Sequence, residues 1–253
     1  MEVITSRRNP LILDFRRLAG DREDRRSLGL YLGQGHKLLS EAIQNHAPVE
    51  TVLYCGEAPA VPAGVRLQPV SADILAYISP MKSAPELLFS CRLPEKRATM
   101  KGRILLAENM QDPGNVGTMI RTAAAFGFDG VLLAGACADP WGPKAVRASM
   151  GAVFRLTVWE SPDAAEAAEN LHEAGIPIYA AALSEENLTA GRFLFPESLA
   201  LAIGNEGHGL SDTLLSAADQ VVRIPMAPGA ESLNAAAAAA VLMWEVYRGR
   251  EDV

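Results

Sequence analysis

Three short segments rich in Gly, Asn and Ser hold the side chains of this sequence that could act chemically on a polar ligand. The candidates are Asn115 and Arg121 in the first segment, Glu206 in the second, and Ser232 and Asn234 in the third. Amide, hydroxyl and carboxylate groups beside a guanidinium can bind a phosphate or a hydroxyl, and can stabilise negative charge that develops on oxygen. Loops of this composition are typical of a backbone shaped around a small ligand.

Each segment, taken by itself, also has an ordinary structural explanation. A helix that begins near Asn115 would be capped by that side chain, and Arg121 would then lie less than two turns from the end that attracts anions. Ser232 could equally cap the alanine-rich helix that follows it. The three glycines among residues 204–209 allow close approach of a ligand, but the spacing GxxGxG occurs in many tight turns. The individual segments therefore leave the function open.

Alternating strands and helices must position these segments. Apolar runs of strand length alternate with helical patterns through the second part of the chain. We expect strands at 103–109, 130–135, 154–159, 176–183, 199–205 and 221–226, and helices at 118–128, 163–175, 212–218 and about 232–247. The pattern predicts an α/β domain with a mostly parallel sheet, whose ligands bind at the carboxyl ends of the strands.

The first part of the chain predicts a second, smaller α/β layer. Two helical stretches flank the extended run YLGQG, a strand follows at 51–56, and a strand and a helix follow at 65–80. The stretch CRLPEKRATMKG combines a proline with several basic residues and little apolar periodicity, so it is expected to be a linker. We place two domains at 1–97 and 98–253.

The charge distribution favours the start of the chain as the place where a polyanion would bind. The whole chain has a net charge of -7, but residues 1–97 carry +2 and the remainder -9, and seven arginines fall in the first 26 residues. A phosphate-rich partner needs local positive charge. The candidates are Arg7, Arg8, Arg16 and Arg17, although a solvated amphipathic helix would also explain them.

Several function classes lose support. The three cysteines form no CxxC pair and the four histidines are scattered, so no metal site is expected. Neither GxGxxG nor GxxxxGK[ST] occurs, which argues against dinucleotide and nucleoside triphosphate binding. No apolar run approaches the roughly 18 to 20 residues that cross a bilayer, and the start of the chain is too polar for a signal peptide. We expect a cytoplasmic protein without a membrane partner.

Together, the three segments resemble the SpoU/TrmH family of RNA methyltransferases, in the SPOUT superfamily. DPGNVGTMIRTAAAFG, LAIGNEGHGLS and IPMAPGAESLNAAAAAAVLMWE are similar to its three motifs, in the family's order and spacing, from about Arg103 to the end of the chain. The start, RRNPLILDFRRL with YLGQGHKLLSEAI, is similar to the substrate-binding extension of many members, which resembles small RNA-binding ribosomal proteins. Gln34 stands where the extension usually has Glu, and alanines follow Asn234 where the third motif usually reads Val-Ser-Val-Ala.

The resemblance implies a fold and a reaction. It implies a C-terminal domain knotted as a trefoil, and transfer of a methyl group from S-adenosylmethionine to a ribose 2'-hydroxyl of RNA, with ribosomal RNA favoured over transfer RNA as the substrate. By motif match, the cofactor would contact Gly204, Ile224 and Leu233. The family's usual state is a homodimer, in which two copies join their loops around one target.

The resemblance also assigns roles to the polar candidates. Arg121 is sometimes described as the base, but a guanidinium has a pKa above about 12, so a phosphate clamp that also stabilises the developing oxyanion is the better hypothesis. Asn115 would position the loop or the ribose, and Ser232 and Asn234 would hydrogen-bond to the nucleotide or to Arg121. Glu206 would orient Arg121 or its equivalent on a partner subunit.

Two other functions are compatible with the sequence. One is a non-catalytic scaffold that binds RNA or the ribosome, against which the presence of all five polar candidates speaks. The other is a knotted methyltransferase that acts on a base nitrogen, which digestion of the modified RNA to nucleosides would reveal.

Overall fold

The computed structural model describes residues 2–79, 85–94, 99–182, 188–229 and 232–249. The chain forms two compact units. The first comprises Met1–Lys96 together with Asp139–Arg155, and the second comprises Arg97–Ala138 together with Leu156–Val253. The first unit therefore includes a segment from the second half of the sequence, which a single boundary at residue 97 does not describe.

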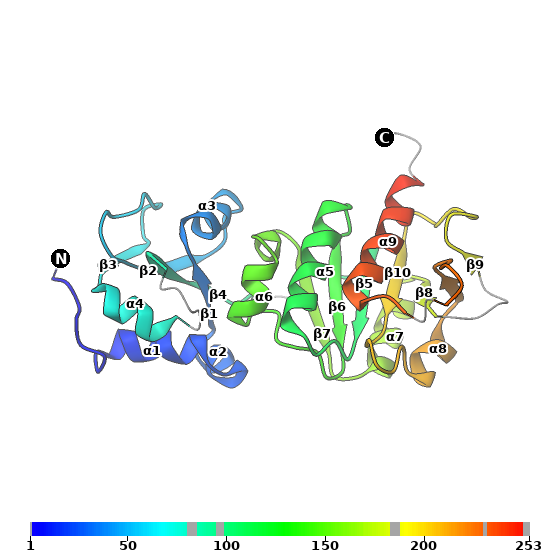
Figure 1. Ribbon diagram of the computed structural model, residues 1–253, viewed down its shortest axis with the longest axis horizontal. Coiled ribbons are helices and arrows are strands. Elements are labelled where there is room, and N and C mark those ends of the chain that lie inside the picture. The colour runs from blue at the N-terminus through cyan, green and yellow to red at the C-terminus, as the bar shows by residue number, and fades with distance from the viewer. Residues whose placement is uncertain (1, 80–84, 95–98, 183–187, 230–231, 250–253) are drawn as a thin grey trace. The chain divides into compact units, whose positions relative to one another are not determined.

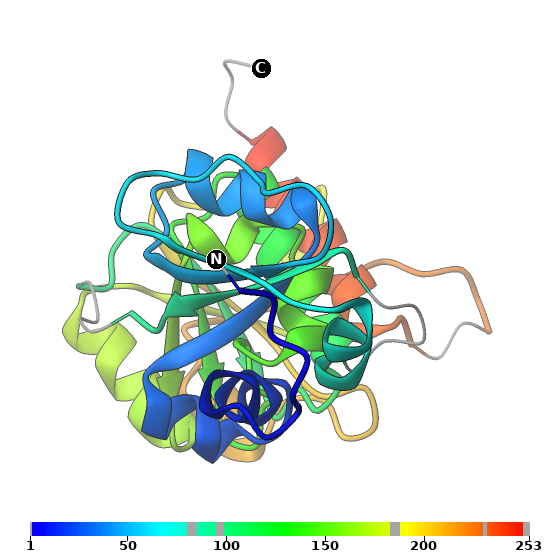
Figure 2. The same cartoon turned by 90° about the vertical axis from the view of Figure 1, so that its left-hand side faces the viewer.

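A four-stranded sheet forms the centre of the first unit, in the order β1-β4-β2-β3. Strand β4 is antiparallel to β1 and β2, whereas β2 and β3 are parallel. Helices α1 and α4 cover one face of the sheet and α3 lies on the other (Figure 2). The elements are α1 (Pro10–Ala19), α2 (Arg22–Leu28), β1 (Leu30–Gln34), α3 (His36–Gln44), β2 (Val49–Tyr54), β3 (Arg66–Pro69), α4 (Ala72–Ile78) and β4 (Leu87–Arg92).

Strand β4 corrects the expected linker. The linker was expected to begin at Cys91, but Cys91 and Arg92 belong to β4 and pair with Tyr31 and Leu30 of β1. The thiol of Cys91 is fully buried, and burial raises its pKa to about 12. It is therefore an inert core group at neutral pH.

The segment that joins the first unit from later in the sequence contains α6 (Pro143–Ala148) and a 3₁₀ turn (Ala152–Phe154), neither of which the sequence predicted. The buried Arg25 guanidinium holds its start through Asp139, with Nη2 to Oδ2 at 2.6 Å. Arg25 also donates to the carbonyl of Gly20 at 2.7 Å. Because the pair is buried, loss of either Arg25 or Asp139 would leave the other charge without a partner. The pair therefore fixes the start of this segment to the first unit.

The second unit contains a seven-stranded, fully parallel sheet in the order β7-β6-β5-β10-β8-β11-β9, which confirms the predicted α/β class. Helices α5 and α9 cover one face, and α7 and α8 cover the other (Figure 1). The strands are β5 (Arg103–Glu108), β6 (Gly130–Ala134), β7 (Thr157–Ser161), β8 (Ile178–Ala181), β9 (Leu188–Thr189), β10 (Leu199–Ile203) and β11 (Gln220–Arg223); the helices are α5 (Pro113–Ala125), α7 (Ala164–Glu173), α8 (Asp212–Ala217) and α9 (Ala235–Arg248).

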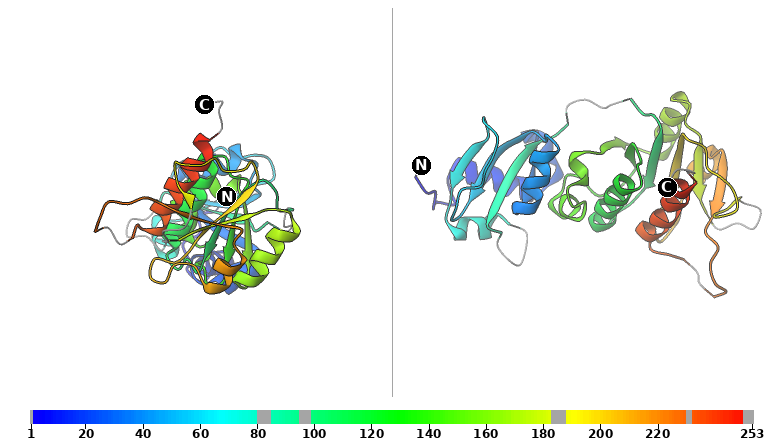
Figure 3. Two further views of the ribbon diagram at one scale, coloured as in Figure 1. Left: turned by 90° about the vertical axis from the view of Figure 1, so that its right-hand side faces the viewer. Right: turned by 90° about the horizontal axis from the view of Figure 1, so that it is seen from above.

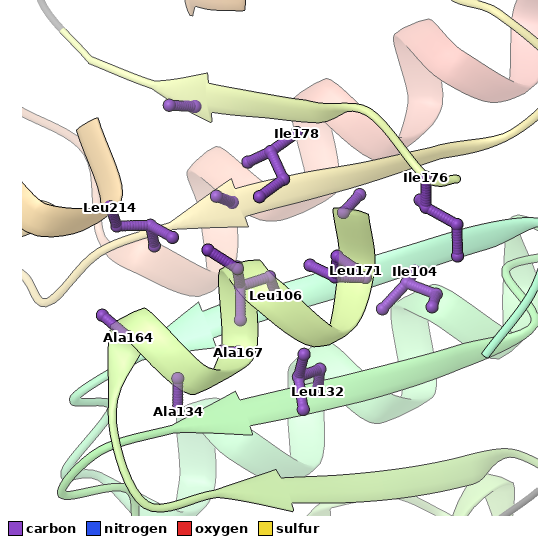
Figure 4. Packing of buried hydrophobic residues seen from close by; sticks show 14 of the residues in the cluster. Ile104, Leu106, Leu132, Ala134, Ala164, Ala167, Leu171, Ile176, Ile178 and Leu214 are labelled. Carbon is purple, nitrogen blue, oxygen red and sulfur yellow. The ribbon is translucent and has the colours of Figure 1, made fainter. Parts of the chain in front are cut away.

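Helix α7 packs on one face of the sheet through alternate residues of its buried strands. Ile104, Leu106 and Leu132 point from neighbouring strands toward Ala167 and Leu171 of α7 (Figure 4). All five side chains are fully buried. Alanine on the helix leaves room for the larger strand residues, so helix and sheet approach closely.

The strand order creates a switch point between β5 and β10. From β5 the chain proceeds to β6 and β7 on one side, and later strands, including β10, lie on the other side (Figure 3). Ile203 at the end of β10 pairs with Ala107 near the end of β5. The loops that follow these two strands therefore emerge side by side, at the position where open α/β sheets bind their ligands.

Candidate active site

A cavity of about 360 Å³ lies beyond the carboxyl ends of β8, β10 and β11. Ala182 after β8, Gly204 after β10 and Ile224 after β11 line it, and Ser232 and Leu233 before α9 complete its wall. Its volume falls within the roughly 300–1,000 Å³ of typical small-molecule sites. The three positions expected to contact a cofactor, Gly204, Ile224 and Leu233, thus line one cavity.

Gly204 allows the loop after β10 to fold back on itself. A Cβ atom at this position would lie 2.1 Å from the carbonyl carbon of Gly209 and 2.3 Å from the backbone nitrogen of Leu210. Asn205 and Gly209 exchange backbone hydrogen bonds of 3.1 and 2.8 Å. The loop is therefore a tight, self-bonded turn that only glycine at 204 permits.

Two residues at the end of β5 attach this loop to the sheet. The buried carboxylate of Glu108 accepts a hydrogen bond from the backbone N–H of Ser211 at 2.8 Å. The carbonyl of Asn109 accepts one from the Asn205 side chain at 3.0 Å. The cavity wall is thereby fixed at both ends before any ligand binds, which lowers the entropic cost of binding.

A polar cluster joins all three predicted segments. Asn115 donates from Nδ2 to Oε1 of Glu206, and Asn234 donates from Nδ2 to the same oxygen at 3.3 Å. Nδ2 of Asn234 also donates to Oδ1 of Asn115 at 3.4 Å. Glu206 lines the cavity as well, so the cluster and the cavity share a side chain.

The start of α5 differs from the expectation. Asp112, not Asn115, is the N-cap, and its side chain accepts from the N–H of Gly114 at 2.9 Å. Because the helix begins at Pro113, Arg121 lies more than two turns from its amino-terminal end. Freed from capping, Asn115 is available to the polar cluster.

The cap of α9 is a second correction. Asn234 caps this helix by accepting from the N–H groups of Ala236 and Ala237 at 3.0 and 3.2 Å, so Ser232 is not the cap. Ser232 lies on the cavity wall and is exposed. Asn234 uses its oxygen for the helix and its amide nitrogen for the cluster, which fixes its orientation.

Arg121 stands apart from the other predicted residues. It is exposed on α5, and none of the described residues forms a hydrogen bond or ion pair with its side chain. The expected pairing with Glu206 is therefore absent within the described chain, and the guanidinium is open to an external anion.

The four arginines at the start of the first unit have different surroundings. Arg17 is paired with Asp24 at 2.7 Å and with Asp14 at 3.7 Å. Arg7 and Arg16 lie over the ring of Tyr77, and Arg8 is exposed. Gln34 Oε1 is 3.4 Å from the hydroxyl of Ser79, which donates to it.

Among the described residues, no group of three His, Cys, Asp or Glu side chains could hold a metal ion. The same residues contain no helix that is both long and apolar enough to cross a membrane.

Comparison with known proteins decides the family. The SpoU rRNA methylase family matches residues 102–244, more than half of the chain. The chain belongs to this family. Over 97% of its length, this SpoU methylase is 31% identical to the 23S rRNA (guanosine(2553)-2'-O)-methyltransferase RlmP of Bacillus subtilis, of which it covers 99%. Over 98% of its length it is 34% identical to a 23S rRNA (uridine(2479)-2'-O)-methyltransferase of Streptomyces viridochromogenes, of which it covers 92%.

Solved structures agree with this assignment. The SpoU methyltransferase AviRb of Streptomyces viridochromogenes in complex with AdoMet superposes with a TM-score of 0.82 at 31% identity, covering 97% of this chain and 99% of that one. An AdoMet-bound rRNA methyltransferase from Sinorhizobium meliloti superposes with a TM-score of 0.86 at 26% identity, covering 98% of both. These comparisons confirm the predicted family, enzyme class and cofactor of this SpoU methylase.

Sequence reasoning missed Asn205, Glu108 and Ser211, which hold the cavity loop in place. Asn205 directly follows the predicted Gly204, so its position beside an expected cofactor contact could have identified it. Glu108 gave none, because an acidic residue that ends an apolar strand is indistinguishable from a solvent-exposed one until the strand order is known.

Proposed function

We propose that the protein transfers a methyl group from S-adenosylmethionine to a ribose 2'-hydroxyl of ribosomal RNA in the cytoplasm. The relatives named as 23S rRNA 2'-O-methyltransferases, which align over nearly the whole chain, support the reaction and the substrate class. Those two relatives act on a guanosine and on a uridine, so family membership leaves the target nucleotide open.

The observation that carries the proposal is the double role of Glu206. Its carboxylate lines the cavity and accepts hydrogen bonds from Asn115 and Asn234. A polar cluster that can bind a ribose is therefore continuous with a cavity suited to a cofactor. Two substrates held side by side in attack geometry are the main requirement of a methyl transfer.

The cavity fits S-adenosylmethionine in its chemistry as well as its size. Apolar side chains such as Ile203, Val222 and Ile224 can pack on a flat purine, while backbone groups of the loop after β10 can bind its polar edge. When bound, this cofactor supplies a methyl group activated by its sulfonium. We propose that Gly204, Ile224 and Leu233, which line one cavity, contact it. We also propose that the chain here is knotted as a trefoil, as membership of the SpoU methylase family implies.

The polar residues then have separate roles in binding the RNA. We assign Asn115, Asn234 and Ser232 to hydrogen bonds with the target nucleotide, and Glu206 to holding both asparagine amides in place. Arg121, exposed and without a partner among the described residues, binds the target phosphate and stabilises negative charge that develops on the 2'-oxygen. A guanidinium beside a phosphate stays protonated, so Arg121 does not serve as the base, and the proton of the 2'-hydroxyl passes to solvent or to the RNA phosphate.

A homodimer is supported by an exposed apolar strip on α9. Val241 and Trp244 are 39% and 46% exposed, and the Trp244 ring packs with Phe126 and Tyr247 at centroid distances of 5.7 and 5.9 Å. Such a patch on an otherwise acidic unit suits a second copy of the same surface. Val241→Glu should convert the dimer to monomer in sedimentation velocity, while Glu169→Lys, on α7 at the opposite face of the sheet, should leave it intact.

The test of the function is methyl transfer to ribosomal RNA, with mass-spectrometric mapping of the product. Arg121→Ala should reduce single-turnover transfer at saturating RNA by roughly 100-fold, as removal of one oxyanion donor does in other enzymes. Arg192→Ala, which removes another exposed arginine of the second unit, is the matched control. Near-normal transfer by Arg121→Ala would disprove its role.

Two other outcomes would replace the proposal. Failure to bind S-adenosylmethionine in calorimetry would indicate a non-catalytic RNA-binding scaffold. Methylated bases rather than 2'-O-methylribose after digestion to nucleosides would indicate a base-nitrogen methyltransferase.

A further inference from the structure

One aromatic ring in the first unit holds two arginines that come from different elements. The guanidinium carbon of Arg7 lies 4.9 Å from the centroid of the Tyr77 ring, and that of Arg16 lies 5.3 Å from it. Arg7 is in the turn before α1, Arg16 is on α1, and Tyr77 is on α4. Both distances are within the roughly 6 Å at which a cation is attracted to an aromatic ring.

The backbone around these arginines is fixed. Ile4 exchanges hydrogen bonds with the end of β3 and the start of α4, accepting from Ser71 at 3.1 Å and donating to Pro69 at 3.1 Å. Arg16 donates from Nη1 to the carbonyls of Tyr77 and Ile78 at 3.0 and 3.3 Å. Hydrogen bonds therefore hold the Arg16 guanidinium, and the contact with the Tyr77 ring places the Arg7 guanidinium near the same side chain.

The two charges are not neutralised by the protein. Neither Arg7 nor Arg16 forms an ion pair with any described residue, and both are exposed. Arg17, their neighbour on α1, is by contrast engaged by Asp24 and Asp14. Two like charges beside one ring repel each other, and a bound anion would relieve that repulsion. Arg7 and Arg16 are therefore able to bind an external anion, whereas Arg17 is already paired within the protein.

We propose that Arg7 and Arg16, held by Tyr77, form a clamp for phosphate groups of the RNA substrate, and that Arg17 does not take part. The proposal rests on the proposed function for the identity of the polyanion. Planar guanidinium groups match the oxygens of a phosphate, and arginine is the side chain of choice for such contacts. Tyr77 is a positioning residue that acts through the two arginines.

The expected magnitude follows from counterion release. Each phosphate contact on single-stranded RNA contributes about 0.7 to the slope of log K against log salt concentration, so loss of one contact lowers affinity about fivefold at about 0.1 M salt. Arg7→Ala and Arg16→Ala should each show this loss. The double variant should lose about 25-fold, with a slope less steep by about 1.4.

Arg17→Ala is the matched control, because it changes the net charge by the same amount from the same surface. Binding of an in vitro transcript of 23S ribosomal RNA is measured by filter retention over a range of potassium chloride concentrations. Arg17→Ala should keep the wild-type slope and affinity. Equal losses for Arg17→Ala and Arg7→Ala would show a diffuse charge effect and overturn the clamp, as would wild-type binding by the double variant.

Tyr77 gives a second test that removes no charge. Tyr77→Phe keeps the ring and should bind RNA like the wild type, whereas Tyr77→Leu should weaken binding several-fold, with thermal unfolding of both variants measured in parallel. Equal binding by Tyr77→Leu and Tyr77→Phe would overturn the positioning role. Arg7→Ala, which removes no hydrogen bond within the protein, keeps the clamp testable if a Tyr77 or Arg16 variant fails to fold.

Different results would contradict the clamp and the proposed function. S-adenosylmethionine affinity, measured by calorimetry, should be the same in all these variants. If the wild-type protein binds the transcript but methylates no ribose, the function is wrong and the binding test of the clamp still applies. If it methylates the RNA while Arg7→Ala retains full affinity and slope, the clamp alone is wrong.

Discussion

Replacing Gly204 by alanine should disable the proposed cofactor cavity without removing a polar side chain. The added Cβ would lie 2.1 to 2.3 Å from three backbone atoms of Gly209 and Leu210. Ordinary contacts of a Cβ atom begin near 3.4 Å, so the two sides of the loop must separate by more than 1 Å. Because the obstructing atoms are backbone, no side chain can rotate away to relieve the overlap.

The energetic cost can be worked from this geometry. Overpacking of this kind costs about 1–3 kcal/mol, and the two backbone hydrogen bonds between Asn205 and Gly209 contribute about 1 kcal/mol each if the loop opens. We therefore expect the free energy of unfolding to fall by about 3–5 kcal/mol if the loop opens. We also expect S-adenosylmethionine to bind at least tenfold more weakly, which corresponds to about 1.4 kcal/mol of binding free energy.

Gly207→Ala, in the same loop, is the control. The Cβ added there would meet only the Asn205 side-chain oxygen, at 3.3 Å, which is tight but can adjust. Calorimetry with S-adenosylmethionine and thermal unfolding should separate the two variants clearly. If Gly204→Ala bound the cofactor as tightly as Gly207→Ala, the reasoning that this turn forms the cavity wall would be refuted.

Two further substitutions probe how the second unit is held together. Glu108→Ala should lower stability by about 1–3 kcal/mol in chemical denaturation because it leaves the N–H of Ser211 unsatisfied, while Glu108→Gln, which keeps an acceptor oxygen, should recover most of the loss. Burial raises the pKa of Asp219, but hydrogen bonds from the Ile178 N–H and from His172 outweigh it and bring the pKa below its ordinary 3.8. This carboxylate therefore stabilises the fold above that value and loses its contribution as pH falls through the lower, folded-state pKa, so Asp219→Asn should flatten the acid side of a plot of unfolding free energy against pH.

The convergence of the candidate loops could be predicted because the end of each strand is marked locally in the sequence. Buried strands such as LALAI show as apolar runs, and the polar turn after each marks its carboxyl end. In a parallel sheet these ends meet at one edge, so loops distant in sequence were expected to converge. The cavity beyond β8, β10 and β11 and the polar cluster of Asn115, Glu206 and Asn234 follow from this rule.

Capping and strand order could not be predicted in the same way. Asp112 and Asn115 are both good N-cap residues, and only the Pro at 113, which favours the first position of a helix, distinguishes them. Strand β4 was missed because the basic residues after it resemble a linker, while its partners β1 and β2 lie far away in the sequence. The return of residues 139–155 to the first unit depends on long-range contacts, among them the buried pair of Arg25 with Asp139 and the packing of Trp141 against Tyr31, which no periodicity reveals.

The corrected caps also explain how one site can serve two substrates. Asn234 uses its oxygen to cap α9 and its nitrogen to reach Glu206, and Asn115, relieved of capping by Asp112, reaches the same carboxylate. A side chain anchored at both ends keeps its direction when water is displaced, so the groups that we propose to contact an RNA ribose need no rearrangement as it binds. Methyl transfer relies largely on positioning, and this preorganisation is what the fold contributes to it.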